Sequence, residues 1–199
     1  MSATASPRMA ASGRRAHLLE TAARVFTEGS YRGTTTAEIA RAAGISEPII
    51  YRHFASKRDL YLAALEYVWA NARASWEQAV STSSDACAAV EAIGKGHVSV
   101  RSAKLQLAEL WVQALGEAAE DPELRKAVRK HMREVHAFVA GLIRKGQAEG
   151  AIVAEHDADA EAWIMLAGGI LGMVGRRVGL LDDDELQAIR AARLAWLRA

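Results

Sequence analysis

The segment between residues 43 and 61, AGISEPIIYRHFASKRDLY, holds side chains of the types that bind nucleic acids. Arg52 and Lys57 are cations that can pair with phosphate oxygens, and Tyr51 and His53 can hydrogen-bond to phosphates. Apolar residues lie between them at short intervals, and a proline lies near the start of the segment. This mixture predicts a small unit that packs its apolar residues together and turns its basic and aromatic residues toward a polyanion.

Two short helices joined by a tight turn must position these side chains. Residues 35–38 read TTAE, which has the spacing of a capping box that opens a helix, and Gly44 permits the left-handed turn that ends it. Ser46 can cap the second helix, and Pro48 is tolerated there because the first helical N–H groups have no intrahelical partner. This is helix-turn-helix spacing, in which the second helix enters the DNA major groove. The helix crossing is expected to be filled by Ile39, Ile45, Ile50 and Phe54.

The stretch from Thr34 to Tyr61 resembles the DNA-binding domain of TetR-type transcriptional regulators. The resemblance extends over residues 12–62, and the rest of the chain is similar in organisation only, as a variable all-helical domain for ligand binding and dimerisation. The positions that match the spacing of the family are Thr35, Thr36, Ile39, Ala40, Ala43, Gly44, Ile45, Ser46, Tyr51, His53, Phe54, Ser56, Lys57, Leu60 and Tyr61.

The resemblance implies a role for each exposed residue of this segment. Thr35 or Thr36 would contact a phosphate at the start of the first of the two helices. Glu47 departs from the commoner small or basic residues, and it could accept a hydrogen bond from cytosine N4 or only favour the positive start of its helix. Tyr51, His53 and Lys57 would contact phosphates, and the alternative is that they are packing or solvated side chains. Base edges or nearby phosphates would be met by Ser46, Glu47, Pro48 and Arg52.

The charge of the chain is unevenly distributed. Residues 1–60 hold nine basic and five acidic side chains, a net charge of +4, whereas the remainder has a net charge of −3. A basic head on a slightly acidic body suggests a polyanion partner for the head alone. The single cysteine, Cys87, fits a reducing compartment, and the N-terminal sequence does not read as a signal peptide. The apolar stretch from Ala162 to Gly175 is shorter than the roughly 20 residues that a membrane span needs, so we expect a soluble cytoplasmic protein.

The composition predicts an all-α fold, because Ala, Leu, Glu and Arg dominate and alternating β-branched residues are almost absent. We expect about nine helices, divided by capping residues. Residues 1–11 are expected to form a flexible arm, residues 12–58 a three-helix helix-turn-helix domain, and residues 59–199 a larger helical domain for ligand binding and dimerisation. The longer expected helices span residues 12–28, 56–79, 85–101, 103–119, 122–149 and 157–180, and the last begins at residue 182.

The helix expected over residues 157–180 is apolar around its whole circumference, which indicates burial on every side. A second copy of the chain could cover one face, and the alternative is a monomer with a thick core. A two-fold dimer carries two recognition helices and would read a palindromic operator. The residues expected at the dimer interface are Trp163, Gly168, Ile170, Leu171, Gly172, Val174, Gly175, Ile189 and Trp196.

A few polar side chains fall on apolar helix faces in the larger domain, which is typical of a small-molecule site. The alternative is that these histidines and tryptophans belong to the core. The effector is expected to be apolar or amphipathic, and neither a cofactor nor a metal site is indicated. The candidate pocket residues are Trp76, His97, Glu109, Trp111, His131, Phe138 and Trp163.

These observations favour a ligand-responsive transcriptional repressor, as the resemblance implies. An enzyme would need a nucleophile–base set, a phosphate-binding loop or a metal cluster; Cys87 has no histidine nearby in sequence, and the glycines at 168–179 follow no strand. We therefore expect no enzymatic activity. The remaining alternative is a DNA-binding architectural or co-regulator protein without a small-molecule ligand.

Overall fold

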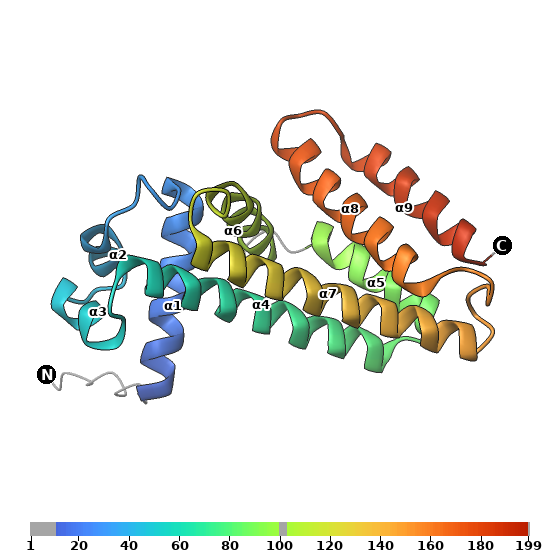
Figure 1. Ribbon diagram of the computed structural model, residues 1–199, viewed down its shortest axis with the longest axis horizontal. Helices are drawn as coiled ribbons and strands as arrows, with labels where there is room; N and C mark the ends of the chain where they lie inside the picture. The colour runs from blue at the N-terminus through green and yellow to red at the C-terminus, as the bar shows by residue number, and fades with distance from the viewer. Residues whose placement is uncertain (1–10, 100–102, 199) are drawn as a thin grey trace, which may run out of the picture. The chain divides into compact units, whose positions relative to one another are not determined.

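The computed structural model describes residues 11–99 and 103–198, and within these ranges it contains nine α-helices and no strand (Figure 1). The all-α prediction is therefore confirmed. The chain divides into two compact units, of which the first ends at Val68 and the second begins at Trp69. The helices are α1 (Ala11–Gly29), α2 (Thr36–Ala42), α3 (Glu47–His53), α4 (Lys57–Thr82), α5 (Ala86–Ser99), α6 (Ala103–Glu117), α7 (Pro122–Ala148), α8 (Ala158–Arg177) and α9 (Asp183–Arg198).

Unit 1 contains α1, α2, α3 and the first turns of α4. Its core is built on aromatic rings: Phe26 meets Tyr61 edge-on with ring centroids 4.9 Å apart, and Tyr31 lies 4.7 Å from Tyr61. Ile39 and Ile50 are fully buried, so the apolar sides of α2 and α3 face inward as the sequence predicts. This core fixes α2 and α3 and leaves the opposite side of α3 exposed.

The ends of the short helices follow the predicted capping chemistry with one difference. The capping box is formed, because the Thr35 side chain accepts a hydrogen bond from the Glu38 N–H while the Glu38 side chain accepts one from the Thr35 N–H. Gly44 has a φ of +68°, the left-handed conformation that makes the turn between α2 and α3. Ser46 occupies the N-cap position of α3, but its side chain makes no capping hydrogen bond.

Unit 2 is organised around the long helix α7. Helices α5, α6 and α8 pack against α7, and α9 packs against α5. Helix α8 ends at Arg177, three residues before the predicted end, because Gly179 adopts a φ of +68° and turns the chain away. The core that joins α5, α7, α8 and α9 consists of Cys87, Val139, Ala140, Ile143, Ile152, Ala158, Ala162 and Leu197.

Helix α8 is long and apolar enough, by length and composition, to cross a membrane. The sequence-based expectation considered only the stretch from Ala162 to Gly175, whereas the whole helix reaches 20 residues. A core helix of a soluble protein passes the same test when it is mostly buried, but only 28% of the apolar window is buried inside this chain. Most of this window therefore lies on the surface of the single chain.

Candidate nucleic-acid interface

The outer side of α3 gathers most of the predicted DNA-binding residues. Ser46, Pro48, Arg52 and His53 are exposed, and Tyr51 retains 49% of its accessible surface. These side chains project from the helix that is anchored on its other side by Ile50. A seven-residue helix with one buried and one polar, exposed face is suited to enter a DNA groove.

The two candidate threonines at the start of α2 differ in environment. Thr35 is exposed and takes part in the capping box with Glu38. Thr36 is buried, and its hydroxyl donates a hydrogen bond to the Glu47 carboxylate and lies 3.0 Å from the Tyr51 hydroxyl. Of the two, Thr35 is the residue whose surface a phosphate can reach.

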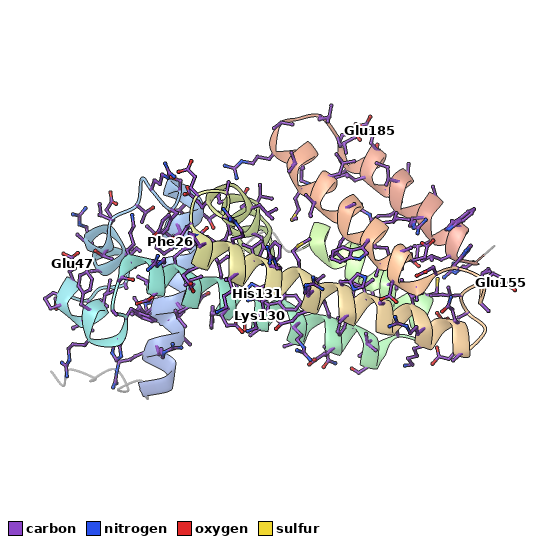
Figure 2. The ribbon with its side chains drawn as sticks, in the orientation of Figure 1. Phe26, Glu47, Lys130, His131, Glu155 and Glu185 are labelled. Atoms are coloured by element: carbon purple, nitrogen blue, oxygen red, sulfur yellow. The ribbon has the colours of Figure 1, made fainter. Side chains whose placement is uncertain are left out.

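Glu47 lies at the first position of α3, where Figure 2 labels it. The side chain is half-buried, and its carboxylate accepts the hydrogen bond from Thr36. Glu47 thus connects the start of α3 to the start of α2. The sequence-based alternatives for Glu47, base reading or a favourable charge at the helix start, did not include this bond, since eleven residues separate the two positions.

The ammonium group of Lys57 binds backbone carbonyls of its own unit. Its ammonium donates hydrogen bonds to the carbonyl oxygens of Tyr31 and Thr34, at 2.9 and 3.1 Å, and lies 4.8 Å from the centroid of the Tyr31 ring. The two carbonyls belong to the turn that precedes α2. Lys57 therefore holds this turn, and these bonds use two of its three ammonium protons.

In unit 2, several of the predicted pocket residues come together. Trp69 on α4 is the hub: its ring centroid lies 5.4 Å from that of Trp76 and 6.2 Å from that of His131. The ring centroid of Trp111 on α6 lies 6.0 Å from that of His131, and the centroid of Phe138 lies 5.7 Å from that of Trp76. We call these five residues the aromatic cluster. His131, labelled in Figure 2, is buried, so the cluster reaches the interior of the unit.

The other predicted pocket residues are not part of the aromatic cluster. Glu109 is half-buried on α6. Trp163 on α8 is 44% exposed and stacks on His136 at 4.2 Å. His97 lies on α5, and its side chain is outside the described residues. Trp69 was not among the predicted pocket residues. Its indole N–H donates a hydrogen bond to Glu134 at 2.7 Å. Its signal in the sequence was its spacing of seven residues from Trp76, which places both rings on one face of α4.

Two parts of the chain match known families. Residues 18–64 match the bacterial regulatory proteins of the tetR family. Residues 88–197, more than half of the chain, match the C-terminal domain of BetI-type transcriptional repressors. The chain belongs to the TetR family. This TetR-family protein therefore combines the helix-turn-helix head, which the sequence already resembled, with a larger domain of the BetI type.

Individual relatives agree with this membership. The HTH-type transcriptional activator FasR of Mycolicibacterium smegmatis is 42% identical over 72 residues, which span 36% of this chain and 33% of the relative. The match thus covers about a third of that relative's length. A TetR-family regulator from Rhodococcus sp. has a TM-score of 0.84 at 22% identity and covers 94% of this chain and 100% of its own. A transcriptional regulator from Saccharomonospora viridis, in complex with choline, has a TM-score of 0.80 at 23% identity over 94% of this chain and 96% of its own. These two structures share the fold.

The outer faces of α8 and α9 carry large apolar side chains. Leu171 and Val174 on α8, and Ile189 and Trp196 on α9, are exposed, as is Trp163. Gly168 is exposed and Ile170 and Gly172 are half-buried, whereas Gly175 is buried inside the chain. A Cβ added at Gly175 would lie 2.9 Å from Leu181, so this glycine permits a close approach within the chain. We call the exposed apolar residues Trp163, Ile164, Leu171, Val174, Ile189 and Trp196 the α8–α9 face.

A polar group lies beside this face. The carboxylate of Glu161, which is buried, forms an ion pair with Arg193 and accepts a hydrogen bond from the indole N–H of Trp196. Burial lowers the pKa of Arg193 from its ordinary value. The ion pair joins α8 to α9.

Proposed function

We propose that this TetR-family protein is a homodimeric repressor that binds a palindromic operator through α3 and leaves it when a small molecule binds unit 2. The observation that carries the proposal is the two-sided character of α3. Ile50 anchors the helix in the core of unit 1, while Tyr51, Arg52 and His53 lie exposed beside it. The proposed role is one of binding, without catalysis.

Phosphates would be contacted at three places around α3. Thr35 lies at the start of α2, Tyr51 and His53 lie on α3, and Lys57 lies at the start of α4. Ser46, Pro48 and Arg52 would meet base edges or neighbouring phosphates in the groove. Contacts of the first kind position the protein on the duplex, whereas contacts of the second kind select its sequence.

The α8–α9 face would be covered by the same face of a second copy. A two-fold pairing places each apolar side chain against an apolar surface, so no other partner is needed. The exposed part of α8 would then be buried as in a soluble cytoplasmic dimer rather than in a membrane. The two α3 helices of such a dimer account for a palindromic operator.

The effector would bind at the aromatic cluster of unit 2. Indole faces attract apolar groups and organic cations, and Glu134 supplies a carboxylate beside Trp69. The choline complex of the relative from Saccharomonospora viridis supports a small ligand of this kind. An effector of this class releases DNA only if it binds more tightly to the conformation that does not fit the operator.

The proposal is tested first by selecting bound duplexes from random DNA at moderate salt. Enrichment of a palindrome with two equal half-sites is expected, and that palindrome then serves as the probe for a screen of small molecules. A folded dimer that enriches no sequence would refute the operator. A palindrome whose binding responds to no effector would instead support a DNA-binding architectural or co-regulator protein.

A further inference from the structure

Three side chains connect α2 and α3 through hydrogen bonds in the helix-turn-helix part of unit 1, which we call the head. The Thr36 hydroxyl donates to the Glu47 carboxylate, and the oxygens of Thr36 and Tyr51 are 3.0 Å apart. Thr36 is buried and Glu47 is half-buried, whereas Tyr51 is 49% exposed. We call this set the Thr36 network. It reaches from the interior of the head to a hydroxyl that the proposed function assigns to a phosphate.

The number of protons fixes the direction of these bonds. An ionised carboxylate offers only acceptors, and each hydroxyl has one proton. The Thr36 proton is used by Glu47, so Thr36 can only accept in its contact with Tyr51. The Tyr51 proton must therefore point inward, to Thr36, and the phenol presents lone pairs to the outside.

A phosphate also offers only acceptors, and it requires a donor from Tyr51. While Glu47 takes the Thr36 proton, a Tyr51 hydroxyl that turns outward gives up its hydrogen bond to Thr36, since Thr36 has no second proton to donate in return. Each phosphate contact made by Tyr51 thus competes with the bond from Tyr51 to Thr36, and Tyr51 is held in that bond because Glu47 accepts from Thr36.

We infer that Glu47 is a positioning residue that holds the Tyr51 proton away from phosphate and thereby lowers the affinity of the head for DNA. This inference rests on the proposed function, because it takes Tyr51 to contact a phosphate. It assigns to Glu47 an action through Thr36 and Tyr51, without any contact between Glu47 and a base.

The substitution Glu47→Gln supplies a donor that the carboxylate lacks, with almost no change in shape. When the amide N–H₂ donates to Thr36, the Thr36 proton is free to bond to Tyr51, and the Tyr51 proton becomes available to phosphate. One additional hydrogen bond per head corresponds to about fivefold tighter binding, and the two heads of a dimer to about 25-fold. Removing a carboxylate near DNA also favours binding, so this gain must be separated from the effect of charge.

A double-mutant cycle with Tyr51→Phe makes this separation. The electrostatic part of the Glu47→Gln gain remains when Tyr51 is replaced, whereas the part that acts through the Tyr51 proton disappears. We therefore expect Tyr51→Phe to weaken binding less than about twofold per head in the wild-type protein and about fivefold per head in the Glu47→Gln protein. Binding is measured on the selected operator by fluorescence anisotropy at several salt concentrations.

Two controls accompany the cycle. Glu28→Gln removes an exposed carboxylate from the same unit, and the gain it gives should be small and should shrink as salt rises. The gain through the Tyr51 proton should persist at high salt. Thr36→Val deletes the link and keeps the charge of Glu47, so it should also tighten binding; circular dichroism of each variant establishes that the helices are retained.

The outcomes are distinguishable. Equal gains from Glu47→Gln with and without Tyr51 would overturn the inference and leave only an effect of charge. A relaxed preference at one base pair in the Glu47→Gln protein, without coupling to Tyr51, would overturn it in favour of base reading. Wild-type protein that binds no operator would refute the proposed function itself, before the cycle is measured.

Discussion

Replacing Lys57 by methionine should loosen the start of α2. The ammonium donates two hydrogen bonds, to the carbonyl oxygens of Tyr31 and Thr34, and lies over the Tyr31 ring. Methionine keeps an unbranched apolar side chain of similar length but cannot donate. Both carbonyls belong to the turn before α2, so the loss of these hydrogen bonds should destabilise this turn first.

The magnitude follows from the contacts. Two charge-assisted hydrogen bonds from a half-buried side chain contribute about 2 kcal/mol together, and the contact with the Tyr31 ring adds about 0.5 kcal/mol. Packing of the methionine side chain offsets part of this. A net loss of about 2 kcal/mol corresponds to about thirtyfold faster opening of the turn and of α2.

Hydrogen exchange followed by mass spectrometry measures this opening directly. Peptides that cover residues 30–42 should exchange about thirtyfold faster in the Lys57→Met protein. Peptides from α7, in unit 2, should exchange as in the wild type and serve as the internal standard. Arg52→Ala is the matched control, because it removes an exposed cation from the same unit and should leave the exchange of α2 unchanged.

Two results would refute this reasoning. Unchanged exchange over residues 30–42 in the Lys57→Met protein would mean that the bonds to Tyr31 and Thr34 do not stabilise the turn and α2. Equal acceleration in α2 and α7 would assign the effect to unfolding of the whole chain instead of to the turn.

Three further predictions concern other parts of the molecule. Hydrogen bonds from Thr35 lower the pKa of Glu38. Glu38 therefore contributes stability that is present above its unfolded-state pKa and is lost as the pH falls through its folded-state pKa. Between about pH 5 and about pH 3, the unfolding free energy of the Glu38→Gln protein should vary less than that of the wild type. Leu171→Glu places a charge on the α8–α9 face and should convert the proposed dimer to monomers in sedimentation experiments. Arg193→Met leaves the Glu161 carboxylate buried without its cation and should lower the unfolding free energy by about 3 kcal/mol in urea titrations. Adding Glu161→Leu to the same chain removes the unpaired carboxylate and should recover most of the lost stability.

The sequence predicts the helices well because their signals are local. The capping box at Thr35 and the turn at Gly44 depend on residues within four positions, and both are formed. The aromatic cluster was predicted in part, since helical periodicity shows which residues share a face but not which faces meet. Trp69, whose ring lies near those of both Trp76 and His131, was not among the predicted pocket residues.

The hydrogen bonds of the head could not be predicted from the sequence. Thr36 and Tyr51 are fifteen residues apart, and Lys57 and Tyr31 are twenty-six apart, so each bond depends on how the helices cross. Residue type alone allows a threonine, a tyrosine and a lysine each to face a phosphate. Only the tertiary arrangement shows that the hydroxyls of Thr36 and Tyr51 lie together and that the ammonium of Lys57 binds two backbone carbonyls.

The polar group beside the α8–α9 face helps to decide what covers that face. By length and composition α8 is apolar enough to cross a membrane, yet Glu161 on α8 is ionically paired with Arg193 on α9 and hydrogen-bonded to Trp196. Moving an ion pair into hydrocarbon costs several kcal/mol, and α9 would have to enter with it. In the proposed dimer a second copy would cover the apolar residues of α8, and the Glu161–Arg193 pair would stay inside the protein with the partners that the chain itself supplies. The proposed dimer therefore accounts for the exposed apolar residues of α8 without moving this ion pair into hydrocarbon.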